Sequence, residues 1–537
     1  MFQQLLSPAG SMWITILLAL IPFAALLFML TVLRITAWLA TIIGGVVTIA
    51  VAVMVWHSPL ITTLKVYLYG GLQGIWVVDW ITFWGLIIFN TLVLTGNFER
   101  FKVWMIKQAT SDVRIQTIML AWAFGALLEG LVGFGYPWAV VVPILIGLGI
   151  ADLEAIRVVA LANNAPVSYG ALGAPILALA AVTGLPLLAL SASVGNIVAI
   201  LALLPPLVLI YLVSGKEGLF EAWPLAIVAS FSYILGQWPA AHFLGPYLPD
   251  VSGALVSFWV LYFFVKVWRP KNTRAYGGRI IPAAEVAITD GGAQPTFQEG
   301  FQAWLPFLVL LVIVVIWTGP WSKLPSYSLF QAHETARSSV TGKPIPSVFN
   351  LTPFSGGTAI LASWLVIVMI LRPKISTVRQ VFARTFNQMW GALLVGFFIF
   401  GIAYVFVFAG LANSLAYSFS KVGWMFVILS PILGWIGVAL SGSNTSANVM
   451  FGPIQAVTGR LLGLPVLLTP SLNSVGAEIG KPIAPQTASV GASTSTLVRS
   501  EGQVIRHNMA WTLVFLAYLI LIGLLFYFVM PNAMMIQ

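Results

Sequence analysis

The chain of 537 residues contains no cysteine and only four histidines. The missing cysteine excludes disulfide bonds, thiol catalysis and thiolate metal sites. The histidines are scattered, and no pair has metal-ligand spacing: His57, His242, His333 and His507. The sequence therefore offers little material for a metal centre or a nucleophilic active site. We predict that the protein is not an enzyme and uses no cofactor.

Charge is also scarce. Charged residues make up 7% of the chain, against about 25% in an average soluble domain, whereas 60% of the residues are hydrophobic. Apolar runs of about 20 residues, the length that crosses a bilayer, recur from end to end. We predict an all-α, polytopic membrane protein with roughly 12 to 14 transmembrane helices. The net charge of +10 requires no nucleic acid, because Lys and Arg concentrate in loops beside membrane spans.

The positions of the basic loops predict the orientation. Lys and Arg gather at residues 97–114, 266–279 and 372–384, which the positive-inside rule places in the cytoplasm. The polar segment 320–354 carries little net charge and is expected outside. Both termini then lie outside, in a multi-pass protein of the cytoplasmic membrane. The segment 57–73 is expected to be interfacial or re-entrant.

The most unusual stretch runs from residue 128 to residue 175. It begins with an acid in apolar surroundings, Glu129, followed by residues that a continuous membrane helix would not choose: Gly130, Gly133, Gly135 and Pro137. Opened backbone at membrane depth survives only where it lines a protein-enclosed cavity. We therefore predict a broken helix at a binding site, with a functional carboxylate. The alternative is that Glu129 caps a helix at the membrane interface.

A second stretch in the carboxyl-terminal half echoes the first. Five residue pairs stand 310 positions apart (473 − 163): Asn163 and Asn473, Gly170 and Gly480, Ala174 and Ala484, Pro175 and Pro485, and Pro143 and Pro453. One offset that serves two separated segments predicts an inverted repeat of two related halves. The expected organisation comprises a first repeat 1–267 with a re-entrant hairpin and broken helix at 115–184, a cytoplasmic linker 268–301, and a second repeat 302–537 with its hairpin and broken helix at 436–496.

Small polar residues surround both breaks. Half-helix amino termini present free N–H groups and a positive dipole end to anions. The side chains that we expect to add donors and acceptors are Asn163 and Asn164 in the first half and Ser443, Asn444, Thr445, Ser446 and Asn448 in the second. Alternatively, small polar residues only join helices by hydrogen bonds.

Three further charged residues have two interpretations each. Glu478 and Lys481 lie three apart, on one face if that turn is helical. An unpaired cation at this depth is costly, and an anionic solute or a partner carboxylate offsets the cost. Lys481 therefore either contacts the substrate or forms a permanent pair with Glu478. Asp79, among Trp76, Trp80 and Trp84, lies at the aromatic headgroup belt or takes part in function.

Four motifs carry a family resemblance. They are LEGxxGFGxP at 128–137, NxAPVxxGAxGxPI at 163–176, SGSNTSxN at 441–448 and GKxIxPQ at 480–486. In their order and spacing they resemble the lactate permeases, proton-linked carriers of lactate and glycolate. The resemblance also suggests kinship with the wider ion-transporter group, in which a Ser-Asn-Thr hairpin tip carries the substrate carboxylate. Ser443, Asn444 and Thr445 match that tip.

The resemblance implies import of a small 2-hydroxy monocarboxylate together with a proton. We expect the substrate carboxylate near Lys481, Gln486 and the N–H groups around Ser443, and Glu129 as the proton carrier. Glu478 and Asp79 are further candidates for proton coupling. The expected hinge residues are Gly130, Gly133, Gly135, Gly170 and Gly480.

Two other classes of transport protein remain open, and so does the oligomeric state. A sodium-coupled carboxylate or dicarboxylate transporter is the alternative within carriers. An ion or anion channel is the alternative outside them, although two unlike half-sites in one chain do not form a ring of one side-chain type. The expected partners are the monocarboxylate, the proton and the lipid bilayer, and both a monomer and a homodimer are compatible with the sequence.

Overall fold

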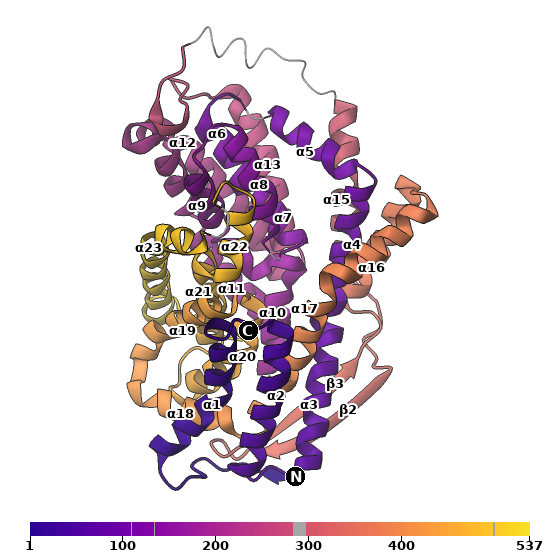
Figure 1. Ribbon diagram of the computed structural model, residues 1–537, viewed down its shortest axis with the longest axis vertical. Coiled ribbons are helices and arrows are strands. Elements are labelled where there is room, and N and C mark those ends of the chain that lie inside the picture. The colour runs from indigo at the N-terminus through magenta and orange to yellow at the C-terminus, as the bar shows by residue number, and fades with distance from the viewer. Residues whose placement is uncertain (109, 134, 283–296, 498–499, 537) are drawn as a thin grey trace.

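The computed structural model describes residues 1–108, 110–133, 135–282, 297–497 and 500–536 (Figure 1). Within this part, nine helical stretches are long and apolar enough to cross a membrane, and ten if one bent helix pair counts as a span. The multi-pass helical architecture is thereby confirmed. The prediction of roughly 12 to 14 crossings came from counting each apolar run of the sequence as a separate helix. The structure instead joins neighbouring runs, as in the 57-residue stretch Leu187–Phe243, which is long enough for two crossings.

The amino-terminal part contains long helices that pack through glycine. Its elements are α1 (Met12–Thr31), α2 (Ala37–Met54), α3 (Leu60–Gly74), the π-helical turn η1 (Ile75–Asp79) and α4 (Trp80–Leu94). The last three form one 35-residue helical stretch, so the expectation of an interfacial or re-entrant segment at 57–73 is wrong. Helix α17 (Ile375–Ala409) lies against α3 where a Cβ on Gly70 would come within 2.6 Å of the Phe400 carbonyl oxygen.

The first broken region follows. Its elements are α5 (Asn97–Gln108), α6 (Val113–Thr117), η2 (Ile118–Phe124), α7 (Gly125–Leu131), α8 (Tyr136–Gly147), α9 (Asp152–Ala162), η3 (Val167–Tyr169) and α10 (Gly170–Thr183). The chain bends by 66° between α9 and the segment Val167–Thr183. Three further helices complete this half: α11 (Leu187–Leu201), α12 (Pro205–Phe243) and α13 (Pro249–Val267).

The second broken region comprises α18 (Leu411–Phe419), η5 (Ser420–Met425), α19 (Phe426–Ser441), α20 (Asn444–Leu461), α21 (Leu468–Gly480), η6 (Lys481–Ile483) and α22 (Pro485–Ser493). From α19 onward, the elements follow the order of α7 to α10: three helices, a short 3-10 turn and a fourth helix. Helix α10 of the first region packs on α20, and α22 of the second packs on α8. This reciprocal packing is what two related halves produce. The chain ends in α23 (Glu501–Phe528) and η7 (Pro531–Met534).

A buried ion-pair network ties the start of the predicted linker to the helices. The described part of the linker holds η4 (Tyr276–Gly278), and its residues 283–296 lie outside the described residues. Arg274 pairs with Glu221 at 2.8 Å, and Glu221 also accepts from Arg114 at 3.1 Å. Arg114 pairs with Asp112 at 2.6 Å and has no exposed side-chain surface. Arg114, which belongs to the basic segment predicted to be cytoplasmic, is therefore a buried member of an ion-pair network.

A small three-stranded sheet accompanies the helices. Between α15 (Phe297–Thr318) and α16 (Gly356–Leu371), the predicted external loop folds into β2 (Phe330–Arg337) and β3 (Pro344–Leu351), which pair antiparallel. Strand β1 (Phe2–Gln3) joins β2 in parallel. Figure 1 shows the sheet and the amino terminus at one end of the long axis, with α5 and α6 near the other. The opposite ends agree with the predicted external loop and cytoplasmic basic loop.

Candidate functional site

The first break is built from glycines and a left-handed turn. Gly133 and Gly135 have φ angles of 65° and 78°, which only glycine adopts without strain, and they lead from α7 into α8. At the start of α10, Ala171, Leu172 and Gly173 all have positive φ, of 48°, 58° and 82°. The backbone therefore opens at the positions where the sequence predicted a broken helix.

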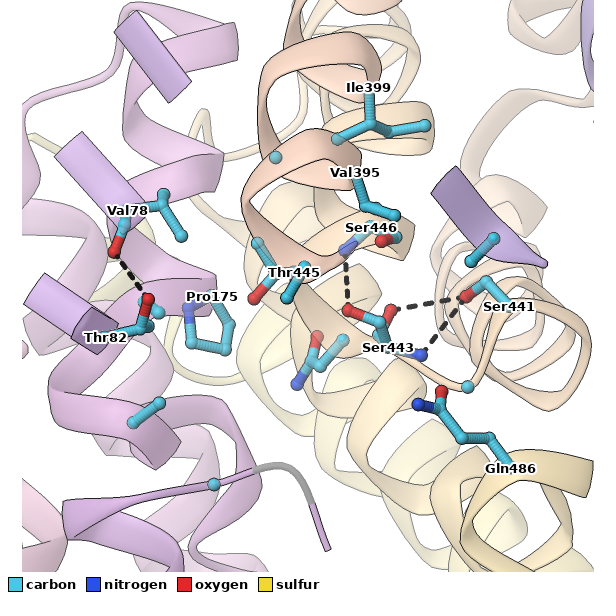
Figure 2. Close-up of a pocket in the computed structure, with 18 of the residues that line it drawn as sticks. Val78, Thr82, Pro175, Val395, Ile399, Ser441, Ser443, Thr445, Ser446 and Gln486 are labelled. Atoms are coloured by element: carbon cyan, nitrogen blue, oxygen red, sulfur yellow. Dashed lines mark hydrogen bonds between the residues drawn. The ribbon is translucent and has the colours of Figure 1, made fainter. Parts of the chain in front are cut away.

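The second break places a helix amino terminus in the same region. Helix α19 ends at Ser441, Gly442 follows with φ 76°, and Ser443 caps α20 by accepting the N–H of Ser446 at 3.2 Å. Figure 2 shows this cap and its link to Ser441, with Thr445 and Gln486 nearby. The N–H groups of Asn444 and Thr445, which precede the capped N–H of Ser446, have no acceptor within the helix and can bind an anion.

An ion pair joins the two halves. Lys481 Nζ lies 2.6 Å from Glu129 Oε1, with 9% and 2% of the respective side chains exposed. Asn163 donates to the other oxygen, Glu129 Oε2, at 3.1 Å. Gly170 keeps this space clear, because a Cβ there would lie 2.7 Å from Glu129 Oε1. Glu129 is therefore not an interfacial cap, and the partner of Lys481 is Glu129 and not Glu478.

Glu478 instead belongs to a buried polar contact between the repeats. Its Oε2 atom accepts the N–H of Ser168 at 3.1 Å and the hydroxyl of Ser168 at 2.5 Å. Ser168 and Glu478 stand 310 positions apart, which is the offset of the repeat. Residues at equivalent positions of two repeats meet where the halves face each other, so this contact marks the centre of the repeat interface.

A cavity of about 490 Å³ lies between two groups of helices. We call α1, α2, η1, α4 and α17 the outer group, and α7–α10 with α19–α22 and η6 the repeat group. The outer group contributes apolar side chains, among them Leu26, Val78, Ile399 and Phe400. The repeat group contributes the polar wall: Glu129, Ser441, Ser443, Asn444, Thr445, Ser446, Lys481 and Gln486. Figure 2 shows Val78 and Thr82 across the cavity from Ser443.

Asp79 also lies in the cavity wall. It is the last residue of η1, 5% exposed, and its Oδ2 atom has no hydrogen-bond partner among the described residues. It faces α17 where a Cβ on Gly396 would come within 2.4 Å of Oδ2. The headgroup-belt interpretation of Asp79 is therefore wrong, and its carboxyl group is available to the cavity.

The other predicted residues fall into two sets. Gly133, Gly135 and Gly170 line the cavity, as do the predicted side chains of the second hairpin tip. The remaining ones lie behind the wall: Asn163, Asn164, Asn448, Glu478, Gly130 and Gly480. Asn448, for example, donates to the Pro175 carbonyl oxygen and to Ser474, both at 3.0 Å. In this conformation these residues support the wall, and substrate contact by Asn163, Asn164 and Asn448 stays a prediction.

Sequence reasoning missed several residues of the site. Asp250 is buried among the helices behind the cavity, and Tyr136 and Gln388 line the cavity with a hydrogen bond of 3.3 Å across it. Asp250 carried a signal, since it is an isolated acid at the start of an apolar run. Tyr136 and Gln388 carried none, because their meeting depends on how α17 crosses α8.

Broken helices that enclose an ion-paired cavity within a multi-pass helical protein define a membrane transport protein. Residues 15–531 match the L-lactate permease family, and the chain belongs to this family. The resemblance seen in the four motifs is thus confirmed, and the relatives are permeases rather than enzymes.

Curated relatives cover nearly the whole chain. The chain is 33% identical to the glycolate permease GlcA of Escherichia coli K12, over 98% of both chains. It is 32% identical to the L-lactate permease of Bacillus subtilis and 30% identical to that of Escherichia coli K12, over 96% of each chain. Among solved structures, the Alcanivorax borkumensis YdaH transporter aligns with a TM-score of 0.44 at 16% identity, covering 88% of this chain and 90% of its own.

Proposed function

We propose that this protein imports a small 2-hydroxy monocarboxylate, lactate or glycolate, across the cell membrane together with one proton. The observation that carries the proposal is the Glu129–Lys481 pair in the wall of the cavity, beside the amino terminus of α20. The names of the relatives, glycolate permease and L-lactate permease, support this substrate class.

The anion site is the ammonium group of Lys481 with the start of α20. A carboxylate that enters the cavity meets the Lys481 cation, the uncapped N–H groups of α20 and the side-chain amide of Asn444. Both amide atoms of Asn444 are buried and lack hydrogen-bond partners among the described residues, and a carboxylate or a 2-hydroxyl group bound in the site would satisfy them. These groups distinguish a hydroxy acid from an apolar solute of the same size.

The ion pair couples the anion to the proton. In the empty site the charges of Glu129 and Lys481 cancel. A substrate carboxylate that pairs with Lys481 leaves Glu129 as an unpaired buried anion, and protonation of Glu129 restores neutrality. The empty site and the fully loaded site are both neutral, whereas an unbalanced charge faces desolvation and about 2.3 kcal/mol per 100 mV of membrane potential. Because only the empty site and the fully loaded site are neutral, only these two forms change their orientation across the membrane readily. Substrate and proton are therefore transported together.

Transport by purified protein in proteoliposomes tests the proposal. We expect radiolabelled lactate or glycolate to accumulate when the lumen is alkaline and sodium is absent. Glu129→Gln mimics the protonated acid permanently, so it should exchange internal for external substrate but lose accumulation driven by the pH gradient. Glu99→Gln removes an exposed carboxylate on α5, which pairs with Lys102 away from the cavity, and should behave as the wild type.

Three results would contradict the proposal. Uptake that requires a sodium gradient would favour the sodium-coupled alternative. Full pH-driven accumulation by Glu129→Gln would remove Glu129 from the coupling step. Absence of uptake of both acids by a folded wild-type protein would refute the substrate class.

A further inference from the structure

A buried carboxyl group lies behind Glu129 and has no place in the transport cycle described above. Asp250, near the start of α13, is 1% exposed. It packs against α7 at Gly130, the residue after Glu129, where a Cβ would come within 2.7 Å of the Asp250 Cβ, and it lies in electrostatic range of Glu129. Its Oδ1 atom accepts the hydroxyl of Tyr233 at 2.9 Å, whereas Oδ2 has no partner among the described residues.

The charges around Asp250 do not balance if every acid is ionised. The charged or titratable groups in electrostatic range of Asp250 are Glu129 on α7, Glu478 on α21, Lys481 on η6, Tyr233 on α12 and Tyr169 on η3. Three carboxyl groups thus share one ammonium group, and that ammonium is already paired with Glu129. An uncompensated buried carboxylate is costly, so the arrangement stores protons on Asp250 and Glu478.

A row of polar side chains continues from Asp250 through otherwise apolar helices. Tyr233 and Gln237 pack side by side on Gly253, where a Cβ would lie 2.8 Å from the Tyr233 ring and 3.1 Å from the Gln237 Cβ. Beyond them, Gly195 leaves room for the Tyr169 hydroxyl and the Gln237 amide at 3.1 and 3.4 Å from its Cβ position. Tyr169 then donates to the Ser191 carbonyl oxygen at 2.6 Å.

Several atoms of this row lack protein partners. Both amide atoms of Gln237, the Ser191 hydroxyl, Asp250 Oδ2 and Glu478 Oε1 have no hydrogen-bond partner among the described residues. Buried polar atoms in this situation are sites for bound water. Water held between hydroxyl groups, with an amide to orient it, forms a path along which a proton can pass. A role confined to packing does not explain why so many polar atoms gather without partners beside an acid.

We propose that Asp250, linked to Tyr233 and continued by Gln237, Tyr169 and Ser191, is a second proton-binding site that exchanges protons with Glu129. This inference rests on the proposed proton coupling. When the substrate anion takes Lys481, the neutral Asp250 carboxyl group gives its proton to the Glu129 carboxylate. Asp250 becomes the carboxylate in that step, and a proton arriving along the polar row restores it.

The test compares two modes of transport in proteoliposomes. Asp250→Asn keeps the size of the side chain and an acceptor for Tyr233 but cannot exchange a proton. We expect substrate exchange within about twofold of the wild type and a loss of pH-driven uptake of about tenfold or more, as for a proton-transfer group. Ser257→Ala, which removes a buried hydroxyl from the same helix, should leave both modes unchanged.

The outcomes separate this inference from the proposed function. Wild-type uptake without pH dependence would refute the proton coupling itself. If the wild-type protein couples uptake to protons and Asp250→Asn has the same pH profile of uptake, Asp250 has only a structural role and the inference is overturned. If Asp250→Asn does not fold, Tyr233→Phe provides the second test: we expect a shifted pH profile of uptake with unchanged substrate exchange, and an unchanged profile contradicts the proton row.

Discussion

At the scale of the residue, the proposed transport depends on one buried ion pair, which we expect the substrate anion to separate. Two isolated charges at this depth cost several kcal/mol each, and their contact of 2.6 Å offsets that cost only while both are present. Asn163 fixes the orientation of Glu129 from behind the wall, which keeps the Lys481 side open to the cavity. The pair is therefore both a stabilising contact and a latent anion site.

Asn444 allows the anion site to be tested apart from the ion pair. Asn444 belongs to the cavity wall, and both its amide atoms are buried without a protein partner among the described residues. On the proposed function, Asn444→Ala should remove a hydrogen bond to the bound anion. Such a bond contributes about 1.5–3 kcal/mol, which predicts a rise in the transport KM of roughly 10- to 100-fold. The measurement is the concentration dependence of initial uptake.

A buried amide away from the cavity provides the control for that variant. Asn413 donates to Gln4 and Ser338 near the small sheet, so Asn413→Ala should lower stability and leave KM unchanged. A normal KM in Asn444→Ala would show that the substrate does not reach the start of α20.

At the scale of the element, the two halves open their backbones by different means. The second half uses a regular cap, with Ser443 accepting from Ser446 after a left-handed glycine. The first half uses three consecutive residues with positive φ, two of them not glycine. That conformation costs roughly 1–2 kcal/mol for each non-glycine residue, and strain of this kind gathers at functional sites. Asp79 is the last residue of a π-helical turn, and Glu129 lies in the helix that directly follows another; such turns occur often at functional sites.

Substitution of two glycines distinguishes the energetic cost of a left-handed backbone conformation from the cost of a steric clash. Gly173 and Gly184 have φ angles of 82° and 67°, so alanine at either position carries the left-handed penalty of about 1 kcal/mol or more. A Cβ on Gly173 would also lie 2.3 Å from the Pro246 carbonyl oxygen, whereas nothing approaches Gly184 within 4 Å. We expect Gly173→Ala to lower the thermal midpoint in detergent well below that of Gly184→Ala. Equal thermal midpoints for the two variants would mean that the backbone around Gly173 shifts to accommodate the added methyl group, and would contradict the prediction.

At the scale of the whole molecule, the cavity lies between the outer group and the repeat group. The proposed transport therefore predicts that these groups move against each other. Tyr136 and Gln388 bridge them by a hydrogen bond of 3.3 Å. Because the chain contains no cysteine, Tyr136→Cys with Gln388→Cys introduces a single defined pair. We expect a short thiol cross-linker to stop substrate exchange.

A pair within one group controls for the chemistry of cross-linking. Asp152 accepts from Thr496 at 2.6 Å at an exposed position on the side of the repeat group. Cross-linking cysteines at these two positions should leave exchange intact. If the Tyr136–Gln388 cross-link also leaves exchange intact, the access route does not pass between the two groups.

The membrane class, the broken helices and the charged residues were predictable because each is a local property of the sequence. The apolar composition predicts a membrane protein, and glycine and proline interrupt a helix at their own positions. An isolated charge in an apolar run, such as Glu129 or Lys481, can be recognised in the sequence alone. The 310-residue offset likewise predicted which segments correspond. Ser168 and Glu478, which are in contact, are separated by the same 310 positions.

Only the tertiary structure decided which charges are partners. Glu478 is three residues from Lys481, yet Lys481 binds Glu129, 352 positions away, and Asp250 lies behind them from a third helix. Spacing along one helix describes neighbours on that helix alone, whereas the energy of a buried charge depends on every element packed around it. For the same reason the sequence placed Asp79 among interfacial tryptophans, and the packing of α17 against η1 put it in the cavity wall.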